Sequence, residues 1–474
     1  MQELNSLFKK HTGKTNPSIE ALPSSGSNRR YYRLTSGKIS LIGVYGQSKE
    51  ENYAFIELAK HFHSQKLNVP RVFKVSNDLH YYLQEDLGDA VLFDAIEAGR
   101  RTGVFSHEEI ELLHKTIAKL ADFQVEAAKG LNFDVCYPQP EFNERSVYWD
   151  LNYFKYSFLK TTGMEFQEDL LENDFQRMTQ KLLEDKTDTF LYRDFQSRNV
   201  MLIDGEPYFI DFQGGRKGPV YYDVASFLWQ AKANFPDELR YELIDTYIKA
   251  LNKHYPVDKD YFLEQLRHFV LFRTLQVLGA YGFRGYFEKK PHFLQSVPFA
   301  LNNLREILKT DFPEYPYLFE IMHEMINLKQ FTDTQKDELE VRVVSFAYKK
   351  GIPSDPSGNG GGYVFDCRAI NNPGKFERFN NVTGLDEPVI EFLKEDGEMD
   401  VYLESIYKLV DSHVKRYMDR SFTNLMVSFG CTGGQHRSVY ASQNVAEHIS
   451  KKFGVKVSLI HREQNLEQAF KKRK

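Results

Sequence analysis

Cysteine is scarce in this chain of 474 residues, which contains three: Cys136, Cys367 and Cys431. They are widely spaced, and none belongs to a Cys-x-x-Cys pair. The sequence therefore indicates neither a disulfide framework nor a cysteine-based zinc site. So few cysteines fit a reducing compartment, and we expect a cytoplasmic location.

Long apolar runs and an excess of positive charge are also missing. The most apolar stretch, residues 268–287, is interrupted by Arg273, Gln276 and Arg284, which predicts a buried helix and not a membrane span. Residues 1–5 lack the basic and apolar segments of a signal peptide, and no membrane partner is expected. The net charge of -5 excludes a nucleic-acid-binding surface that covers the whole molecule, so any such surface must be local.

The length and composition predict a globular protein of several domains. Hydrophobic residues make up 42% and charged residues 27%, which is ordinary for such a protein, while 474 residues are too many for one core. We expect an N-terminal lobe at 1–87, a helical lobe at 88–325, a linker at 326–339 and a small domain at 340–474. No internal repeat is visible.

Local patterns support this division. Residues 31–34 and 39–44 predict a β-hairpin around the turn 35–38, and apolar spacing predicts a helix over 51–65. Another strand is expected at 80–85, followed by mostly helical sequence. The last region combines strands at 341–346, 425–429 and 455–460 with a helix at 438–453, an order that predicts a small α/β domain.

The segment from Arg193 to Asn199, followed by Asp211, carries the most specific chemistry. Phosphoryl transfer in kinase-type sites needs one Asp to receive the proton of the attacking hydroxyl, and an Asn and a second Asp to hold magnesium. Asp194 fits the first role, and Asn199 and Asp211 fit the second. The alternative is a loop in which Asp194 and Asn199 cap local turns.

The stretches 190–202, 210–213 and 218–226 resemble the aminoglycoside phosphotransferase and choline kinase superfamily, and are most similar to its anomeric kinases of N-acetylmuramate and N-acetylglucosamine. The resemblance covers residues 15 to 325. It implies an α+β bilobal protein-kinase-like fold, with ATP, Mg²⁺ and a small hydroxylated acceptor. Arg193 and Asp223 would support the catalytic loop. Asp223 also fits the N-terminal cap of a helix.

The expected nucleotide loop departs from the usual glycine-rich pattern. It has one glycine, and the resemblance assigns phosphate binding to Ser25, Gly26, Ser27, Asn28, Arg29 and Arg30. A plain hairpin turn is the alternative. The strand at 40–45 lacks the usual phosphate-binding lysine, so Arg29 or Arg30 is a candidate for that charge. Glu57, the expected partner of such a lysine, fits a surface salt bridge equally well.

A second loop, residues 430–438, follows an apolar strand and opens a helix. Its small residues let the backbone approach an anion, while the helix N-terminus and Arg437 supply positive charge. Cys431 and Arg437 also fit the Cys-x5-Arg pattern of cysteine phosphatases. No general acid can be placed for that reaction, and a buried, unreactive Cys431 is the preferred interpretation.

Residues 340–474 resemble the C-terminal domain of the RNase adapter RapZ family. The segments that carry the resemblance are 344–346, 363–368, 372–373, 383–389, 430–440 and 461–463. It implies binding of an amino-sugar phosphate, glucosamine 6-phosphate in that family, and in some members of a small RNA. The candidate pocket residues are Asp366, Arg368, Thr432, Gly433, Gly434, His436 and Arg437.

These observations predict an ATP-dependent amino-sugar kinase with a C-terminal domain that senses a phosphorylated amino sugar. An alternative is a phosphosugar-responsive RNA adapter with a kinase-like scaffold. RNA would bind the basic tail Lys471–Lys474, which fits a solvated helix end equally well. A further alternative is a choline or amino-alcohol kinase, which would need an acidic pocket for a cation.

Overall fold

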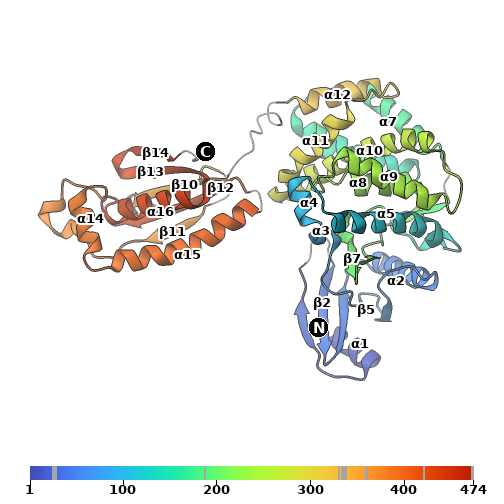
Figure 1. The fold of residues 1–474 in the computed structure, drawn as a ribbon, viewed down its shortest axis with the longest axis horizontal. Helices are drawn as coiled ribbons and strands as arrows, with labels where there is room; N and C mark the ends of the chain where they lie inside the picture. Colours follow the sequence, from blue (N-terminus) through green and yellow to red (C-terminus); the bar gives the residue numbers. More distant parts are fainter. Residues whose placement is uncertain are drawn as a thin grey trace. The chain divides into compact units, whose positions relative to one another are not determined.

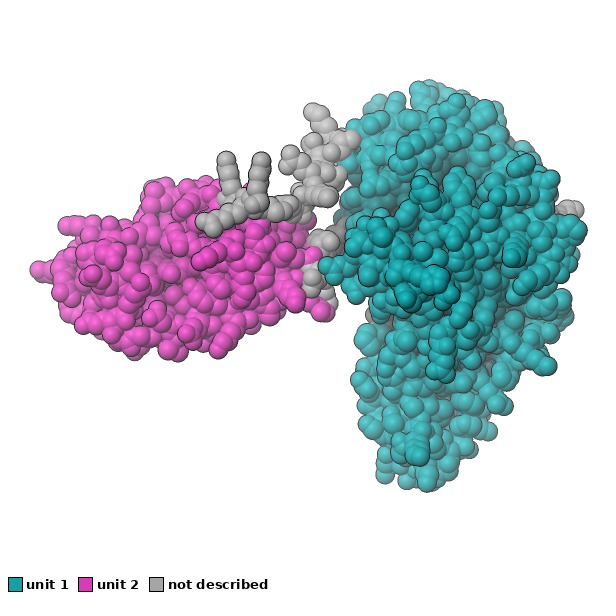
Figure 2. Space-filling model, in the orientation of Figure 1, with its two compact units in different colours: residues 1–332 teal, residues 333–474 magenta. Residues whose placement is uncertain are grey.

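A computed structural model describes residues 1–23, 29–185, 188–328, 331, 339–357, 361–419 and 422–470. The chain divides into two compact units, Met1–Thr332 and Asp333–Lys474 (Figure 2). Their boundary falls within the interval 326–339, where the sequence predicts a linker. Each unit has its own apolar core.

A five-stranded antiparallel sheet opens the first unit, with strand order β1-β2-β3-β5-β4. The strands are β1 (Ser18–Ala21), β2 (Arg30–Ser36), β3 (Ile39–Tyr45), β4 (Val72–Val75) and β5 (Tyr81–Glu85). The predicted hairpin is confirmed, because Ser36 pairs with Ile39 and Gly37 adopts φ 62° in the turn. Helix α1 (Gln2–Thr12) packs on β4 and β5.

Helix α2 (Lys49–Ser64) follows β3 and confirms the predicted helix. Its first turn is capped by Ser48, whose side chain accepts a hydrogen bond from the Glu51 backbone N–H. Its buried face includes Phe55, whose ring stacks on Phe212 with centroids 4.8 Å apart. This contact ties the sheet-bearing part of the unit to the segment that carries Asp211.

The rest of the first unit is mainly helical (Figure 1). Its helices are α3 (Leu92–Ala95), α4 (Glu97–Thr102), α5 (His107–Ala128), η1 (Phe133–Val135), α6 (Glu144–Ser157), η2 (Leu159–Thr162), α7 (Glu168–Leu182), α8 (Tyr221–Leu228), α9 (Asp237–Leu251), α10 (Lys259–Gly282), η4 (Phe283–Phe287), η5 (Pro291–Ser296), α11 (Val297–Ile307) and α12 (Pro316–Ile326). The predicted buried helix is α10, which packs against α6, α8 and α11. Among the described helices, none has the length and apolar character needed to cross a membrane.

Two small antiparallel pairs lie between α7 and α8. Strand β6 (Thr189–Leu191) pairs with β9 (Arg216–Gly218), and β7 (Val200–Ile203) pairs with β8 (Glu206–Phe209). Helix α5 packs on β6 and β8, and the short helix η3 (Ser197–Asn199) leads into β7. The loops between these strands carry Asp194, Asn199 and Asp211.

The second unit is a five-stranded sheet with order β11-β12-β10-β13-β14. Strands β10 (Glu340–Ala347), β11 (Tyr363–Asp366), β12 (Asn424–Cys431) and β13 (Lys456–His461) run parallel, and β14 (Leu466–Phe470) is an antiparallel edge. Helix α16 (Arg437–Phe453) packs on β10, β12 and β13, and α15 (Glu398–Asp419) packs on α16 (Figure 1). The remaining helices are η6 (Tyr348–Lys350), η7 (Pro373–Lys375), η8 (Glu377–Phe379), α14 (Glu387–Lys394) and η9 (Arg462–Gln464). The predicted small α/β domain is confirmed.

Candidate functional site

The three residues expected to carry phosphoryl transfer come together in the first unit. Asp194 follows β6, Asn199 ends η3 and Asp211 follows β8. The Asn199 amide Nδ2 donates to the backbone oxygen of Asp194 at 2.8 Å and lies 3.5 Å from Asp211 Oδ2. Asp194 is exposed, whereas Asp211 is half-buried. The accessible Asp194 carboxylate therefore lies beside Asn199 and Asp211, which are less exposed.

The backbone of this cluster is held in an unusual conformation at two positions. Arg193 has φ 76° and Asp211 has φ 67°, both in the left-handed region that side chains other than glycine seldom adopt. Such residues cost roughly 1–3 kcal/mol each and persist only where the surroundings determine them. Local sequence preference therefore does not account for the loop.

Asp223 is one of the residues that hold the backbone of this loop in place. Its buried carboxylate accepts hydrogen bonds from the backbone N–H groups of Tyr192 at 2.7 Å and Arg193 at 2.8 Å, and from the Gln124 side chain at 2.7 Å. Burial raises the pKa of Asp223 to about 7, while these donors oppose the rise. In the structure Asp223 is the third residue of α8 and not its N-terminal cap.

Two further side chains secure the loop, and the sequence offered no signal for one of them. The Arg193 guanidinium donates to the buried Asp150 carboxylate on α6 at 3.0 Å. The Tyr192 hydroxyl donates to the backbone oxygen of Ile210, which joins the segments before Asp194 and before Asp211. Asp150 lies 43 residues from Arg193, and only the packing of α6 reveals the pair.

The surroundings of Asp211 suit a cation. Burial raises the pKa of Asp211, and the nearby charge of Asp194 raises it further. Gln213 Nε2 donates to Asp211 Oδ1 at 2.8 Å, which leaves Oδ2 facing Asn199. The Asp211 carboxylate is a ligand that Mg²⁺ accepts, and Asn199 would join it once its amide turns its oxygen, in place of Nδ2, toward the ion. A cation there would relieve the repulsion between the two carboxylates.

Of the expected nucleotide loop, Ser25, Gly26, Ser27 and Asn28 lie outside the described residues. Arg29 is described and is 3% exposed. Its Nη2 donates to the Glu51 backbone oxygen at 3.0 Å and lies 3.5 Å from the Glu51 carboxylate on α2. Arg30, the first residue of β2, is exposed.

The charges around Arg29 connect it with the magnesium candidate. Burial lowers the pKa of Arg29, but four neighbours together raise it above its usual value: Tyr82, Tyr31, Glu51 and Asp211. Glu57 instead pairs with Lys60 at 2.7 Å on the surface of α2, as the salt-bridge alternative predicts. Glu51 was not predicted as a partner, because the sequence cannot show which turn of α2 approaches Arg29.

In the second unit, the predicted phosphosugar residues gather at one edge of the sheet. Asp366 ends β11, residues 432–436 follow β12, and α16 begins at Arg437. Strands β11 and β12 are parallel, so both carboxyl ends open on this edge. In parallel sheets this is the usual place for a ligand. Thr432 and Gly433 are exposed there.

Arg437 and His436 are buried and serve as cross-links. Arg437 Nη1 donates to the backbone oxygens of Arg368 at 2.9 Å and Ile370 at 2.8 Å. His436 Nε2 lies 2.9 Å from the Phe379 backbone oxygen. Both side chains therefore tie the loop to segments that precede α14.

The remaining candidates are more open. The Arg368 guanidinium pairs with the Asp366 carboxylate at 2.7 Å on the surface, and this hydrogen bond lowers the pKa of Asp366, to which the nearby Arg437 also contributes. Gly434 has φ 65°, and a Cβ there would lie 2.8 Å from the Ala347 backbone nitrogen. Only glycine fits this position, which brings the loop backbone close to β10.

Cys431 is buried at the end of β12. Its Sγ accepts a hydrogen bond from the Gly434 N–H at 3.2 Å and lies 3.1 Å from the Ser438 hydroxyl. These contacts favour the structural interpretation of Cys431 over a nucleophile. The basic tail, Lys471–Lys474, lies outside the described residues.

Comparison with protein families agrees with both resemblances. Residues 18–261 match the family model of the phosphotransferase enzyme family, and residues 339–465 match that of the RapZ C-terminal domain. Curated relatives include a nucleotide-binding protein of Xylella fastidiosa, 34% identical over 134 residues, and one of Histophilus somni, 36% identical over 143 residues. These matches cover 28% and 30% of this chain and 44% and 48% of the relatives, so the chain spans less than half of their length.

Solved structures similar to this chain include two choline kinases. The enzyme from Cryptosporidium parvum is 10% identical, with a TM-score of 0.47, over 65% of this chain and 96% of that one. The enzyme from Streptococcus pneumoniae is 13% identical, with a TM-score of 0.44, over 65% of this chain and all of that one. The assignment rests on the family models: the chain belongs to the phosphotransferase enzyme family, with the expected α+β kinase-like fold, and carries a RapZ C-terminal domain.

Proposed function

We propose that this protein transfers a phosphoryl group from ATP to a hydroxyl of an amino sugar, with Mg²⁺ as cofactor. The acceptor is of the N-acetylmuramate or N-acetylglucosamine type, and the anomeric hydroxyl is the site of transfer. The observation that carries the proposal is the convergence of Asp194, Asn199 and Asp211 on one loop system braced by Asp223.

The side chains take distinct roles in this reaction. Asp194 is exposed and accepts the proton of the acceptor hydroxyl as that oxygen attacks the γ-phosphorus. Asn199 and Asp211 would hold Mg²⁺, which would neutralise phosphate charge. The hydrogen bonds from Asn199 and to Asp223 keep Asp194 in place, so little reorganisation is needed during transfer.

Arg29 takes over the charge that a lysine on β3 would supply. It is buried beside Glu51 on α2 and close enough to Asp211 for that carboxylate to raise its pKa. A cation anchored to a helix glutamate near the magnesium ligands is the arrangement that kinases use to orient phosphates. Arg30 and the loop 25–28 would contribute further contacts.

The charges beside the catalytic loop favour a sugar over choline. Burial lowers the pKa of Lys232, and the nearby positive charges of Arg198 and Arg100 lower it further. Cations beside η3 suit a neutral or anionic acceptor, and Glu97, Asp94 and Glu109 act on the charge of Arg100.

The second unit would bind a phosphorylated amino sugar at the carboxyl edge of its sheet. Thr432 and Gly433 present exposed backbone, and Arg368 offers a guanidinium that can exchange Asp366 for a phosphate. A phosphorylated amino sugar, the kind of product that the first unit would make, could then regulate the kinase activity by binding to the second unit. An RNA adapter with a kinase-like scaffold is the competing function.

Mg-ATP assays with a panel of acceptors test the proposal. We expect ADP release with N-acetylmuramate or N-acetylglucosamine and a sugar 1-phosphate as product. Transfer to choline but to neither sugar would contradict the amino-sugar assignment and make choline the acceptor. If no acceptor is phosphorylated and RNA is recovered by crosslinking, the adapter function holds instead.

A further inference from the structure

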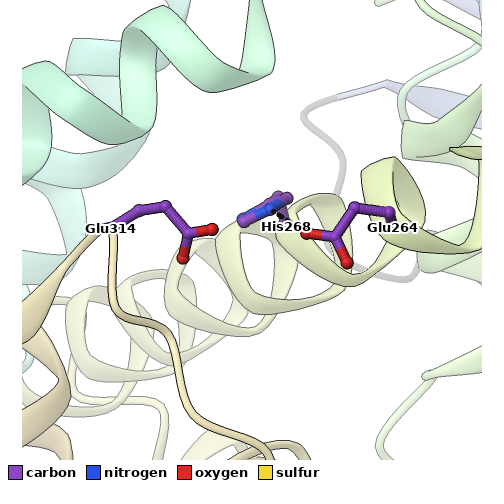
Figure 3. Close-up of side chains that lie close together, drawn as sticks. All are labelled: Glu264, His268 and Glu314. Carbon is purple, nitrogen blue, oxygen red and sulfur yellow. Dashed lines mark hydrogen bonds and ion pairs between the residues drawn. The ribbon is translucent and has the colours of Figure 1, made fainter.

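A cluster of two carboxylates and an imidazole lies outside the kinase site, within the helical part of the first unit. Glu264 and His268 stand one turn apart on α10, and Glu314 comes from the segment between α11 and α12. Figure 3 shows both carboxylates turned toward the His268 ring. Within the part of the chain that the structure describes, this is the one group of three or more His, Cys, Asp or Glu residues arranged to hold a metal ion.

The geometry of the cluster is compact. His268 Nε2 lies 3.2 Å from Glu264 Oε1, and the ligand atoms of all three residues lie within 4.8 Å of one another. Two ligand atoms about 2.0–2.1 Å from a tetrahedral zinc ion are roughly 3.3 Å apart, close to the Glu264–His268 separation.

An orienting residue is already present. The Tyr315 hydroxyl lies 3.0 Å from His268 Nδ1, and both side chains are fully buried. Its oxygen can accept the Nδ1 proton, which leaves the lone pair of Nε2 for a metal. Histidine ligands almost always have such a partner on the other ring nitrogen, because it fixes the tautomer and the ring orientation.

Glu314 provides an independent reason to expect a ligand. Its Oε2 atom is buried, and among the described residues it has no hydrogen-bond partner. A buried carboxylate oxygen needs a donor or a cation, because burial removes its hydration. Arg267, also on α10, lies 3.5 Å from Glu264 Oε2, and within the described residues it supplies no hydrogen bond to Glu314 Oε2.

We propose that Glu264, His268 and Glu314 bind a divalent transition metal ion of the zinc class. One imidazole with carboxylates suits zinc better than magnesium, which prefers oxygen ligands alone. Glu314 also lines a surface hollow of about 450 Å³ with Arg177, Lys181 and Glu184, so this ligand borders solvent. The bound ion would clamp the 313–315 segment to α10.

Equilibrium dialysis of the full-length protein against Zn²⁺ tests the site. Chelator-treated protein is dialysed with excess Mg²⁺, which occupies the oxygen ligands of the kinase site, and bound zinc is counted by mass spectrometry. We expect one zinc ion per wild-type chain and at least a tenfold weaker affinity in Glu314→Gln, which keeps the shape of the side chain and removes its charge. Glu264→Gln should weaken binding similarly.

Glu320→Gln is the matched control, because Glu320 is an exposed glutamate on α12, close in sequence to Glu314. It should bind zinc as the wild type does. Cobalt substitution adds a spectroscopic readout, with visible absorption from Co²⁺ on His268 that disappears in His268→Gln. Equal zinc affinity in the wild type and Glu314→Gln would overturn the proposal, as would unchanged cobalt absorption in Glu314→Gln and Glu264→Gln.

Discussion

The loop that carries Asp194 in the first unit and the glycine-containing loop of the second both follow a strand, yet they use buried charge in opposite ways. In the first, the buried carboxylates of Asp223 and Asp150 hold backbone N–H groups and Arg193, while Asp194 stays exposed. In the second, the buried cation Arg437 holds two backbone oxygens, and the pair Asp366–Arg368 stays exposed.

This difference separates residues that fix the shape of a loop from residues whose charge is accessible to a ligand. A buried charge that satisfies backbone groups is costly to remove, because its partners are left without hydrogen bonds. An exposed charge contributes little to stability and is available to a ligand. Arg437, the strongest sequence signal for an anion in the second unit, therefore has a scaffold role, and Arg368 is better placed to meet a phosphate.

Replacing Asp194 should produce the largest effect, because it removes the exposed chemical group and leaves the scaffold. Asp194→Asn keeps the shape of the side chain and should lower kcat by about 10²–10⁴-fold. Steady-state ADP release measures the loss, and thermal unfolding should show an unchanged melting temperature. Full activity in Asp194→Asn would remove this residue from the mechanism.

In the second unit the scaffold and the exposed pair can be separated by two arginine variants. Arg437→Ala leaves the buried oxygens of Arg368 and Ile370 without donors and should destabilise the unit by about 1–3 kcal/mol. Hydrogen exchange of α16 and β12 measures this change. Arg368→Ala should preserve exchange protection and weaken binding of glucosamine 6-phosphate in calorimetry. The comparison fails if Arg368→Ala unfolds the unit while Arg437→Ala does not.

Variants of two glutamates on α2 test whether Arg29 contributes to ATP binding. Glu51→Gln weakens the anchor of Arg29 and should raise the KM for ATP about tenfold, which corresponds to roughly 1.4 kcal/mol. Glu57→Gln removes a surface pair with Lys60 and should leave the KM unchanged. Equal effects of the two variants would show that Arg29 does not act through Glu51.

The last prediction is a pH dependence of stability that has opposite signs in the two units. Asp223 titrates at about 7 in the folded protein against an ordinary 3.8, so raising the pH between these values lowers the stability of the first unit. Burial lowers the pKa of His461 to about 4 from 6.5, so the same change raises the stability of the second unit. Each slope is at most about 1.4 kcal/mol per pH unit.

Denaturant unfolding followed separately in each unit between pH 4 and 7 measures these slopes. Asp223→Asn should flatten the first, and His461→Gln should flatten the second. Slopes of the same sign in both units would show that these two groups do not govern the response.

The predicted parts of the fold were those set by short-range patterns. The alternation in residues 31–44 and the periodicity of 51–65 specified β2, β3 and α2, because neighbouring residues decide those structures. Those patterns left two roles open for Glu57 and gave no sign that Glu51 would meet Arg29. Periodicity places a residue on a helix, but only packing shows which turn faces Arg29.

The sequence by itself determined the two families, the element order and the identity of the loop that carries Asp194, Asn199 and Asp211, because motif spacing and residue type are local properties. Only the tertiary structure shows which charged side chains are buried and hold the backbone in place. Gln124 meets Asp223 across 99 residues, and Glu314 reaches His268 from another part of the chain. The energy of a buried polar pair depends on distance and desolvation in three dimensions, which no spacing along the chain encodes.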